Sequence, residues 1–95
     1  MAKLIVTAQL NPNGTEALSK YLEGMKALNE KAEAKPLAKY EINATIIGSS
    51  KLSYVAVMEF PNEESIHQLF SSEDYKNLLS YREQAFIKVD AFISK

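Results

Sequence analysis

Arg82 is the residue of this sequence whose charge is hardest to reconcile with its place in the chain. In "SSEDYKNLLSYREQAF" (residues 71–86), helical spacing puts Arg82 on one face with the apolar residues Tyr75, Leu78, Leu79, Ala85 and Phe86. A guanidinium is always charged in proteins, so burying it without a partner costs several kcal/mol. Three explanations are open: an ion pair within the chain, with Glu59 as first candidate; a side chain that reaches solvent past Phe86; or a bidentate contact with an anionic ligand.

Glu59 is the candidate catalytic residue, because it lies among Val55 and Val57 on one face of the apolar run "YVAVMEF". A carboxylate in such surroundings could act as a general base that removes a proton next to a carbonyl, with Arg82 stabilising the negative charge that develops. In the alternative interpretation, Glu59 anchors a dimer or caps the neighbouring helix, since a single carboxylate specifies no chemistry.

Polar side chains elsewhere extend this candidate site. Thr7 and Gln9 share a strand face, and we expect them to line the same interior as Glu59, which would make it a polar cavity that binds a small molecule. Tyr40 and Tyr75 would each supply a phenol to the ligand. The alternative is that these groups form hydrogen bonds across a dimer interface. Packing or surface positions are assigned to Tyr21, Tyr54 and Tyr81.

Several kinds of site are excluded by the residues present. The chain has no Cys, which removes disulfides, thiol nucleophiles and thiolate metal ligands. His67 is the only histidine, so it cannot build a zinc site of the usual kind, and we expect it at a helix boundary or surface. No P-loop, dinucleotide fingerprint, calcium loop or G-x-S-x-G motif occurs. We therefore expect neither a metal nor a cofactor.

The size and charge of the chain limit its organisation and its partners. We expect its 95 residues to form one domain, residues 1–95. The 11 basic and 12 acidic residues give a net charge of −1 without a basic stripe, which argues against binding to nucleic acid or to an anionic membrane. The apolar run near the start is too short to span a membrane and lacks a signal-peptide layout, so the cytoplasm is the expected location.

Hydrophobic periodicity predicts the elements that must position these residues. Pro36 is expected to end the first helix. The expected N-caps of the helices are, in chain order, Asn13 or Thr15, Asn62, and Ser71 or Ser72. The predicted elements are strand 3–10, helix 15–34, strand 37–47, strand 54–60, a short helix from 63, a helix from about 72 to 87, and strand 89–94.

This β-α-β-β-α-β order is that of the split βαβ, or ferredoxin-like, arrangement of class α+β. Right-handed crossovers then give a four-stranded antiparallel sheet with all helices on one face. Strand 54–60 is apolar on both faces, however, and the helices can cover only one of them. Leaving the other face wet would forfeit about 1.5–3 kcal/mol for each large side chain. We therefore expect a homodimer in which two sheets pack face to face.

The second half of the chain resembles a known family. Glu59-Phe60-Pro61 ends a strand, Ser72-Glu73-Asp74-Tyr75 opens a helix, and Arg82 follows. In this order and spacing the sequence resembles the small bacterial proteins grouped as domain of unknown function 1330, within the dimeric α/β-barrel superfamily. The resemblance covers most of the chain. It implies a ferredoxin-like dimer whose sheets form a barrel with a pocket, and it brings no established activity.

The superfamily to which the resemblance points is functionally diverse, so it does not decide the chemistry. It includes cofactor-independent monooxygenases of aromatic polyketides, muconolactone isomerases, haem-degrading enzymes and ligand-sensing regulatory domains. In the haem-degrading members, the iron-ligand His lies on the helix with a similar start. Here that stretch offers Leu78, Leu79 and Ser80 instead, which argues against haem.

Two functional hypotheses follow. In the first, the protein binds a small anionic or aromatic molecule in a pocket between sheet and helices, and any catalysis is cofactor-independent, monooxygenase-like or isomerase-like by analogy. In the second, it is a non-catalytic structural or ligand-sensing dimer module in which Glu59 and Arg82 form an internal salt bridge.

Overall fold

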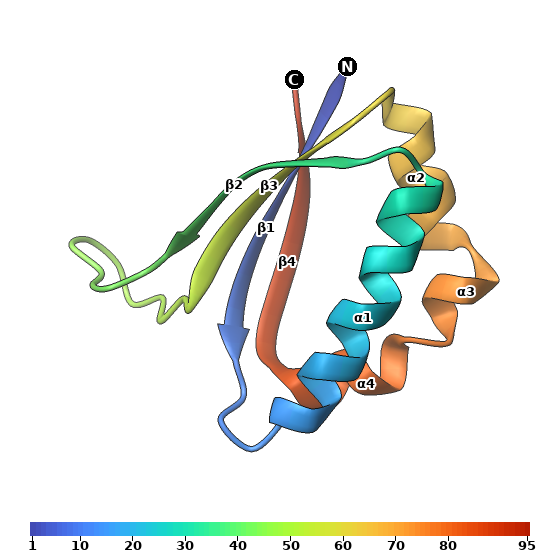
Figure 1. The fold of residues 1–95 in the computed structure, drawn as a ribbon. Helices are drawn as coiled ribbons and strands as arrows, with labels where there is room; N and C mark the ends of the chain where they lie inside the picture. The colour runs from blue at the N-terminus through green and yellow to red at the C-terminus, as the bar shows by residue number, and fades with distance from the viewer.

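The computed structural model describes residues 1–95 as one sheet with helices packed on one side of it (Figure 1). Strands and helices follow in the predicted ferredoxin-like order, with the second helical region divided into three. None of these helices is both long enough and apolar enough to pass through a membrane. The elements are β1 (Ala2–Leu10), α1 (Thr15–Lys31), β2 (Lys35–Glu41), β3 (Tyr54–Phe60), α2 (Glu63–Ser71), α3 (Glu73–Lys76), α4 (Leu79–Ala85) and β4 (Phe86–Ser94).

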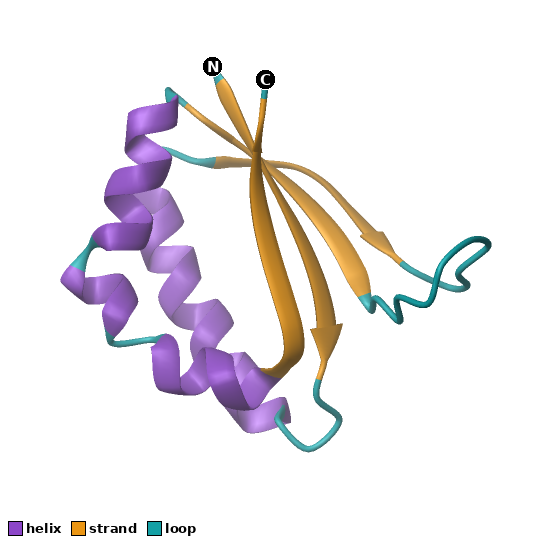
Figure 2. Cartoon of the chain, turned by 180° about the vertical axis from the view of Figure 1, so that it is seen from behind, coloured by secondary structure: helices purple, strands orange, loops and turns teal.

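The four strands form an antiparallel sheet in the order β2-β3-β1-β4. All the helices lie against the same face, as the view from behind shows (Figure 2). We call this the inner face of the sheet and the other the outer face. The predicted α+β class, strand pairing and one-sided helical cover are confirmed.

The core lies between the helices and the inner face. Even-numbered residues of β1 and β3 point inward, so that Leu4 pairs with Met58 and the fully buried Phe60 closes one end. Helix residues such as Ile66 pack against them. The buried residues are Ala2, Leu4, Ala8, Ala17, Tyr21, Phe60, Ile66, Leu69, Tyr75, Ala85 and Phe86.

Strand β2 is shorter than predicted, because it ends where its partner begins. Glu41 pairs with Tyr54, the first residue of β3, and the Ile42 amide bonded to the Ser53 carbonyl (2.9 Å) is the last link. The apolar alternation of residues 42–47 therefore has no strand to pair with. Those residues begin a loop that projects past the end of the sheet, with Ile46 and Ile47 almost fully exposed (Figure 1).

The first helix begins and ends differently from the prediction. Its N-cap is Gly14, and no side chain caps it, so neither Asn13 nor Thr15 has the expected role. The helix ends at Lys31, and Glu33 turns the chain with a φ of 59°. Pro36 therefore lies within the edge strand β2, where a missing amide hydrogen is tolerated, and it does not end the helix.

The second helical region is capped as predicted but is more broken. Asn62 Oδ1 accepts from the Ser65 amide (2.8 Å), and Ser72 Oγ accepts from the Tyr75 amide (3.1 Å). The helix expected to run from about 72 to 87 is interrupted, because the Leu78 amide bonds to the Tyr75 carbonyl in a tighter turn (2.9 Å). This interruption separates α3 from α4 and sets the relative directions of Tyr75 and Arg82.

Gly14 lies where the turn after β1 packs against the end of α4. The Asn11 amide donates to the Ala85 carbonyl (2.9 Å), and Asn11 Nδ2 donates to the Gln84 carbonyl (3.0 Å). A Cβ on Gly14 would collide with that same Gln84 carbonyl oxygen. We expect Gly14→Ala to lower the free energy of unfolding by about 1–3 kcal/mol, measured by urea denaturation, because the backbone must shift.

Gly24→Ala is the matched control for this experiment. Its Cβ would meet Leu78 Cδ2 at 2.5 Å, which is the end of a flexible side chain, and alanine gains up to about 1 kcal/mol of helix propensity over glycine. We expect a clearly smaller loss than for Gly14→Ala. An equal or larger loss at Gly24 would contradict the assignment of Gly14 as the tighter contact.

Candidate functional site

A cavity of about 320 Å³ lies between the helices and the inner face of the sheet. Most of its lining is apolar and comes from β1, β3, α1 and β4, with Val6, Met25 and Met58 as examples. Its polar side chains are those of Tyr21, Tyr54, Tyr75, Arg82, Lys39, Asn29 and Asp90. An apolar cavity with a few convergent polar groups is typical of a small-molecule site.

Arg82 and two tyrosines form a chain of hydrogen bonds in this cavity. Arg82 Nη1 donates to the Tyr75 hydroxyl (3.0 Å), and that hydroxyl lies 3.1 Å from the hydroxyl of Tyr21. Tyr75 and Tyr21 are only 5% and 8% exposed, whereas Arg82 is half-buried. The three residues come from α3, α1 and α4, so the chain of hydrogen bonds joins three helices.

Aromatic packing fixes the two phenols. The rings of Tyr21 and Tyr75 meet edge to face with centroids 6.4 Å apart. Phe86 packs edge-on against Tyr21 at 5.5 Å, and Phe70 against Tyr75 at 4.9 Å. Since the rings cannot rotate freely, the hydroxyls are held in position for Arg82.

The guanidinium of Arg82 has no carboxylate partner. The ion pairs of the structure join other residues, all of them outside this cluster, and the hydrogen bond to Tyr75 is to a neutral phenol. The positive charge therefore lies beside a mostly apolar cavity without a carboxylate to compensate it.

The expected ion pair between Glu59 and Arg82 is absent, because the two residues lie on opposite faces of the sheet. Glu59 pairs in register with Lys3 of β1 and Lys35 of β2, all pointing to the outer face. Arg82 comes from a helix that covers the inner face. The prediction that Glu59 and Arg82 form an internal salt bridge, which belonged to the structural-module hypothesis, is therefore wrong.

Thr7, Gln9 and Tyr40 also lie on the outer face. Thr7 pairs with Val55 of β3, and Tyr40 pairs with the same Val55 from the other side. Of the six residues predicted for the site, the structure thus brings together only Tyr75 and Arg82. The remaining four (Thr7, Gln9, Tyr40 and Glu59) share an outer face without helical cover.

Tyr21 and Tyr54 are cavity residues that sequence reasoning assigned to packing or surface. Burial, with the Tyr75 hydrogen bond adding to it and Arg82 opposing it, raises the pKa of Tyr21 well above that of an ordinary phenol. Burial also raises the pKa of Tyr54. Both phenols stay protonated at neutral pH and can donate hydrogen bonds. The available signal was that Tyr21 shares the inward stripe of its helix with Ala17 and Met25, where a hydroxyl needs a partner.

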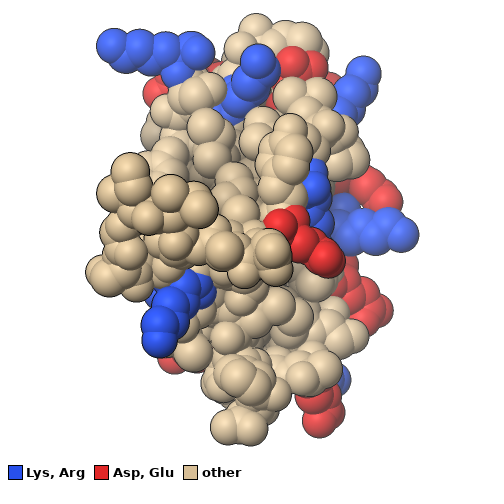
Figure 3. All heavy atoms as spheres, turned by 90° about the vertical axis from the view of Figure 1, so that its left-hand side faces the viewer, with Lys and Arg blue, Asp and Glu red and all other residues tan.

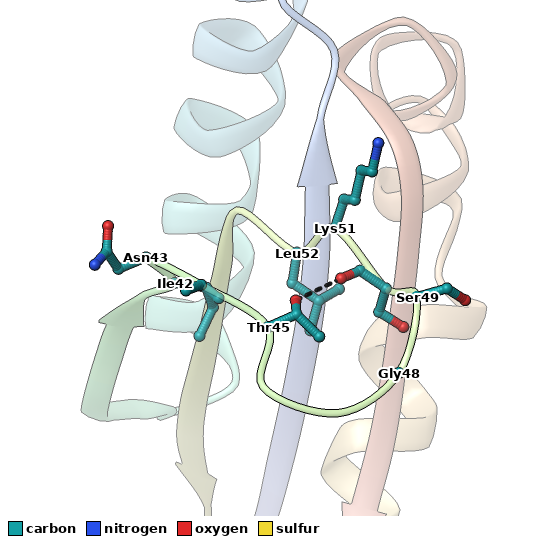
Figure 4. Close-up of a pocket in the computed structure, with 9 residues that line it drawn as sticks. Ile42, Asn43, Thr45, Gly48, Ser49, Lys51 and Leu52 are labelled. Atoms are coloured by element: carbon teal, nitrogen blue, oxygen red, sulfur yellow. Dashed lines mark hydrogen bonds between the residues drawn. The ribbon is translucent and has the colours of Figure 1, made fainter.

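A larger hollow of about 480 Å³ is formed by the loop between β2 and β3 (Figure 4). The Thr45 hydroxyl donates to the Ser50 carbonyl (2.6 Å) across it, and Lys51 is its only charged residue. Its lining comes from residues 42–52 alone and is mostly exposed. His67 is likewise exposed, on α2, with Nε2 3.4 Å from Glu63 Oε1. Neither place gathers the groups needed for chemistry, and no cluster of three metal-ligating side chains occurs.

A family model matches residues 4–94, which is nearly the whole chain. The chain belongs to the family described as Domain of unknown function (DUF1330). The predicted DUF1330 resemblance is confirmed. No curated protein matches this DUF1330 chain.

Solved structures with the same fold are known from several bacteria. A protein of unknown function from Rhodopseudomonas palustris has a TM-score of 0.87 at 16% identity, covering 99% of the DUF1330 chain and 80% of its own. A dimeric protein of unknown function and ferredoxin-like fold from Bacteroides fragilis has a TM-score of 0.66 at 11% identity. The match covers 99% of the DUF1330 chain and 94% of the other. SnoaB, a cofactor-independent oxygenase from Streptomyces nogalater, has a TM-score of 0.68 at 6% identity. The match covers 99% of the DUF1330 chain and 90% of SnoaB. At these identities the likeness establishes the fold alone.

The buried phenol of Tyr21 makes the stability of the protein sensitive to alkaline pH. Its pKa is raised in the folded state, so above about pH 10 the unfolded chain loses this proton while the folded chain keeps it. The resulting stabilisation is fully present below about pH 10 and is lost as pH rises further. We expect Tyr21→Phe to flatten this alkaline decline in urea denaturation series, although the lost hydrogen bond costs about 1 kcal/mol at neutral pH.

Tyr40→Phe is the control, because Tyr40 is an exposed phenol on the other side of the sheet. In the Tyr40→Phe variant, the free energy of unfolding should fall with alkaline pH as steeply as in the unmodified protein. Identical pH slopes for all three proteins would contradict the proposed burial of the Tyr21 hydroxyl.

Proposed function

We propose that this protein binds a small molecule with an acidic group and an apolar, aromatic body in the cavity between its sheet and helices. The observation that carries this proposal is the guanidinium of Arg82, which is half-buried beside an apolar cavity and hydrogen-bonded to a phenol instead of a carboxylate. A bound carboxylate or phenolate would neutralise it.

The chemistry of the polar groups favours an anion. A guanidinium has five N–H donors, and one of them donates to Tyr75 in this structure. Its planar fork suits the two oxygens of a carboxylate. One hydroxyl proton of the Tyr75–Tyr21 pair is used in the hydrogen bond between them, and the other is left to donate to a negatively charged oxygen.

The surrounding rings favour an aromatic body. Tyr54, Phe70 and Phe86 line the cavity together with the two hydrogen-bonded tyrosines. Each well-placed contact between such a ring and an aromatic ligand would add about 0.5–1.5 kcal/mol to the binding free energy, beyond the effect of the area buried.

Cofactor-independent catalysis on the bound molecule is the second candidate function. Donors that bind an anion also stabilise the enolate or phenolate that develops during proton abstraction. A cofactor-independent oxygenase is the description of the Streptomyces protein with this fold, and it supports the candidate by analogy only. Glu59 faces away from the cavity, so in this reading Tyr75 and Tyr21 act only as hydrogen-bond donors to the developing negative charge and do not remove the proton.

The binding proposal is tested with 2-naphthoate, a rigid aromatic monocarboxylate, in isothermal titration calorimetry. We expect Arg82→Gln to weaken binding at least about 10-fold, since hydrogen bonds to a charged group contribute about 1.5–3 kcal/mol. Lys76→Gln removes a positive charge from an exposed helix position and should change affinity less than about twofold.

Arg82→Lys separates binding from folding in that experiment. It keeps the charge but loses the bidentate fork, so we expect a folded protein with intermediate affinity. Absence of naphthoate binding to the unmodified protein, or equal binding by the Arg82→Gln variant, would contradict the proposal.

We further propose that the protein is a homodimer joined through the outer face of the sheet. At the centre of this face, Ile5, Val55 and Val57 are half-buried although no helix covers them, while Tyr40 and Phe92 remain 61% and 55% exposed. Figure 3 shows this side of the molecule as largely uncharged, with most of its charged side chains towards the margins. The protein of this fold from Bacteroides fragilis is described as dimeric, which supports a dimer but not a particular face.

In such a dimer the polar residues of the outer face would meet the partner. Thr7 and Gln9 would form hydrogen bonds across the interface, and Tyr40 would cover apolar area while its hydroxyl stays near solvent. Glu59, beside Lys3 and Lys35 in the register, would help to align the two copies through charge pairing.

Val57→Glu tests the dimer, because Val57 lies opposite Ile5 and Ala38 at the middle of the outer face. We expect the unmodified protein to sediment as a dimer and the variant as a folded monomer, since a buried unpaired carboxylate opposes association. Ala27→Glu, on the exposed side of α1, should remain dimeric. A monomeric unmodified protein at high concentration would contradict the proposal.

A further inference from the structure

Lys39 places a second positive charge at the cavity that holds Arg82. It lies on β2 opposite Ala56 of β3, on the inner face, and it lines the same cavity. Its Nζ is 4.6 Å from the centre of the Tyr54 ring. Like Arg82, Lys39 forms no ion pair.

Three tyrosines connect the two cations. Lys39 lies over Tyr54, Tyr54 and Tyr21 line the same cavity, and Tyr21 shares its hydrogen bond with Tyr75 beside Arg82. The two cations therefore contact different rings of the cavity, Lys39 that of Tyr54 and Arg82 the hydroxyl of Tyr75.

No acidic side chain compensates either charge. Among the residues that line the cavity, the only acidic one is Asp90, whose Oδ2 lies 3.8 Å from Nζ of Lys88. In the register of the sheet, Asp90 is opposite Thr7, which belongs to the outer face. The cavity is thus mostly apolar, with one positive charge beside Tyr75 and another beside Tyr54.

We infer that the ligand of this cavity is an elongated diacid: a rigid apolar or aromatic body with one acidic group bound by Arg82 and a second bound by Lys39. This inference rests on the proposed binding function and narrows it to a chemical class. Lys39, with its amine close to solvent, would select among ligands that Arg82 alone binds equally well.

The test compares 2-naphthoate with naphthalene-2,6-dicarboxylate, which have the same ring system and one or two carboxylates. In calorimetry at low ionic strength we expect the diacid to bind about fivefold more tightly, the increment of a partly exposed charge pair. Lys39→Met should abolish this preference by weakening binding of the diacid more than binding of naphthoate, whose carboxylate is bound by Arg82. Added salt should reduce the preference in the unmodified protein.

Lys20→Met is the matched control. Lys20 also lies over a tyrosine ring, with Nζ 6.0 Å from the centre of Tyr81, but it does not line this cavity. It should keep the preference for the diacid. A preference that survives in Lys39→Met, or is lost equally in Lys20→Met, would overturn the role of Lys39.

The outcomes separate this inference from the function on which it rests. If naphthoate binds in an Arg82-dependent manner but the diacid binds no better, the diacid inference fails and the binding function stands. If neither probe binds, both fail.

Discussion

Successive side chains of a strand point to opposite faces, and this alternation divides the molecule into two surfaces with different chemistry. The even-numbered residues of β1 and β3 meet the helices and form the core and the cavity. The odd-numbered residues form an outer face that is apolar at its centre and has no cover of its own. Because a shift of one residue would exchange the two sets, core, cavity and outer face depend on the same register.

The cluster at Arg82 also depends on the fact that helices cover only the inner face of the sheet, because no acidic residue from that face pairs with the guanidinium. A carboxylate on the inner face would satisfy the guanidinium and close the site as a structural ion pair. Tyr75 and Tyr21 instead orient the charge without neutralising it, and their rings contribute to the core. Such a group is positioned by the fold but electrostatically incomplete, which is common where proteins bind charged ligands.

Local signals in the sequence predicted much of the fold. Strand β3 has the predicted bounds, and Asn62 and Ser72 cap the helices as expected, because alternation and capping are decided within a few residues. The strand predicted over 37–47 was too long, since its end depends on where a distant partner begins. The pairing of Glu59 with Arg82 was wrong for a similar reason: both residues have apolar neighbours, but only tertiary packing decides which face a helix covers. The role of Tyr21 required the position of Tyr75, which is 54 residues away in the chain.

Pro36 on the edge strand has a consequence for how copies of this protein can assemble. It offers no amide hydrogen, and the pairing of β2 with β3 shifts between Pro36 and Ala38, so this rim of the sheet is a poor template for an added strand. Continuous fibres need strands to join at both rims of every copy in turn. Open-ended association of sheets edge to edge is therefore disfavoured at this rim.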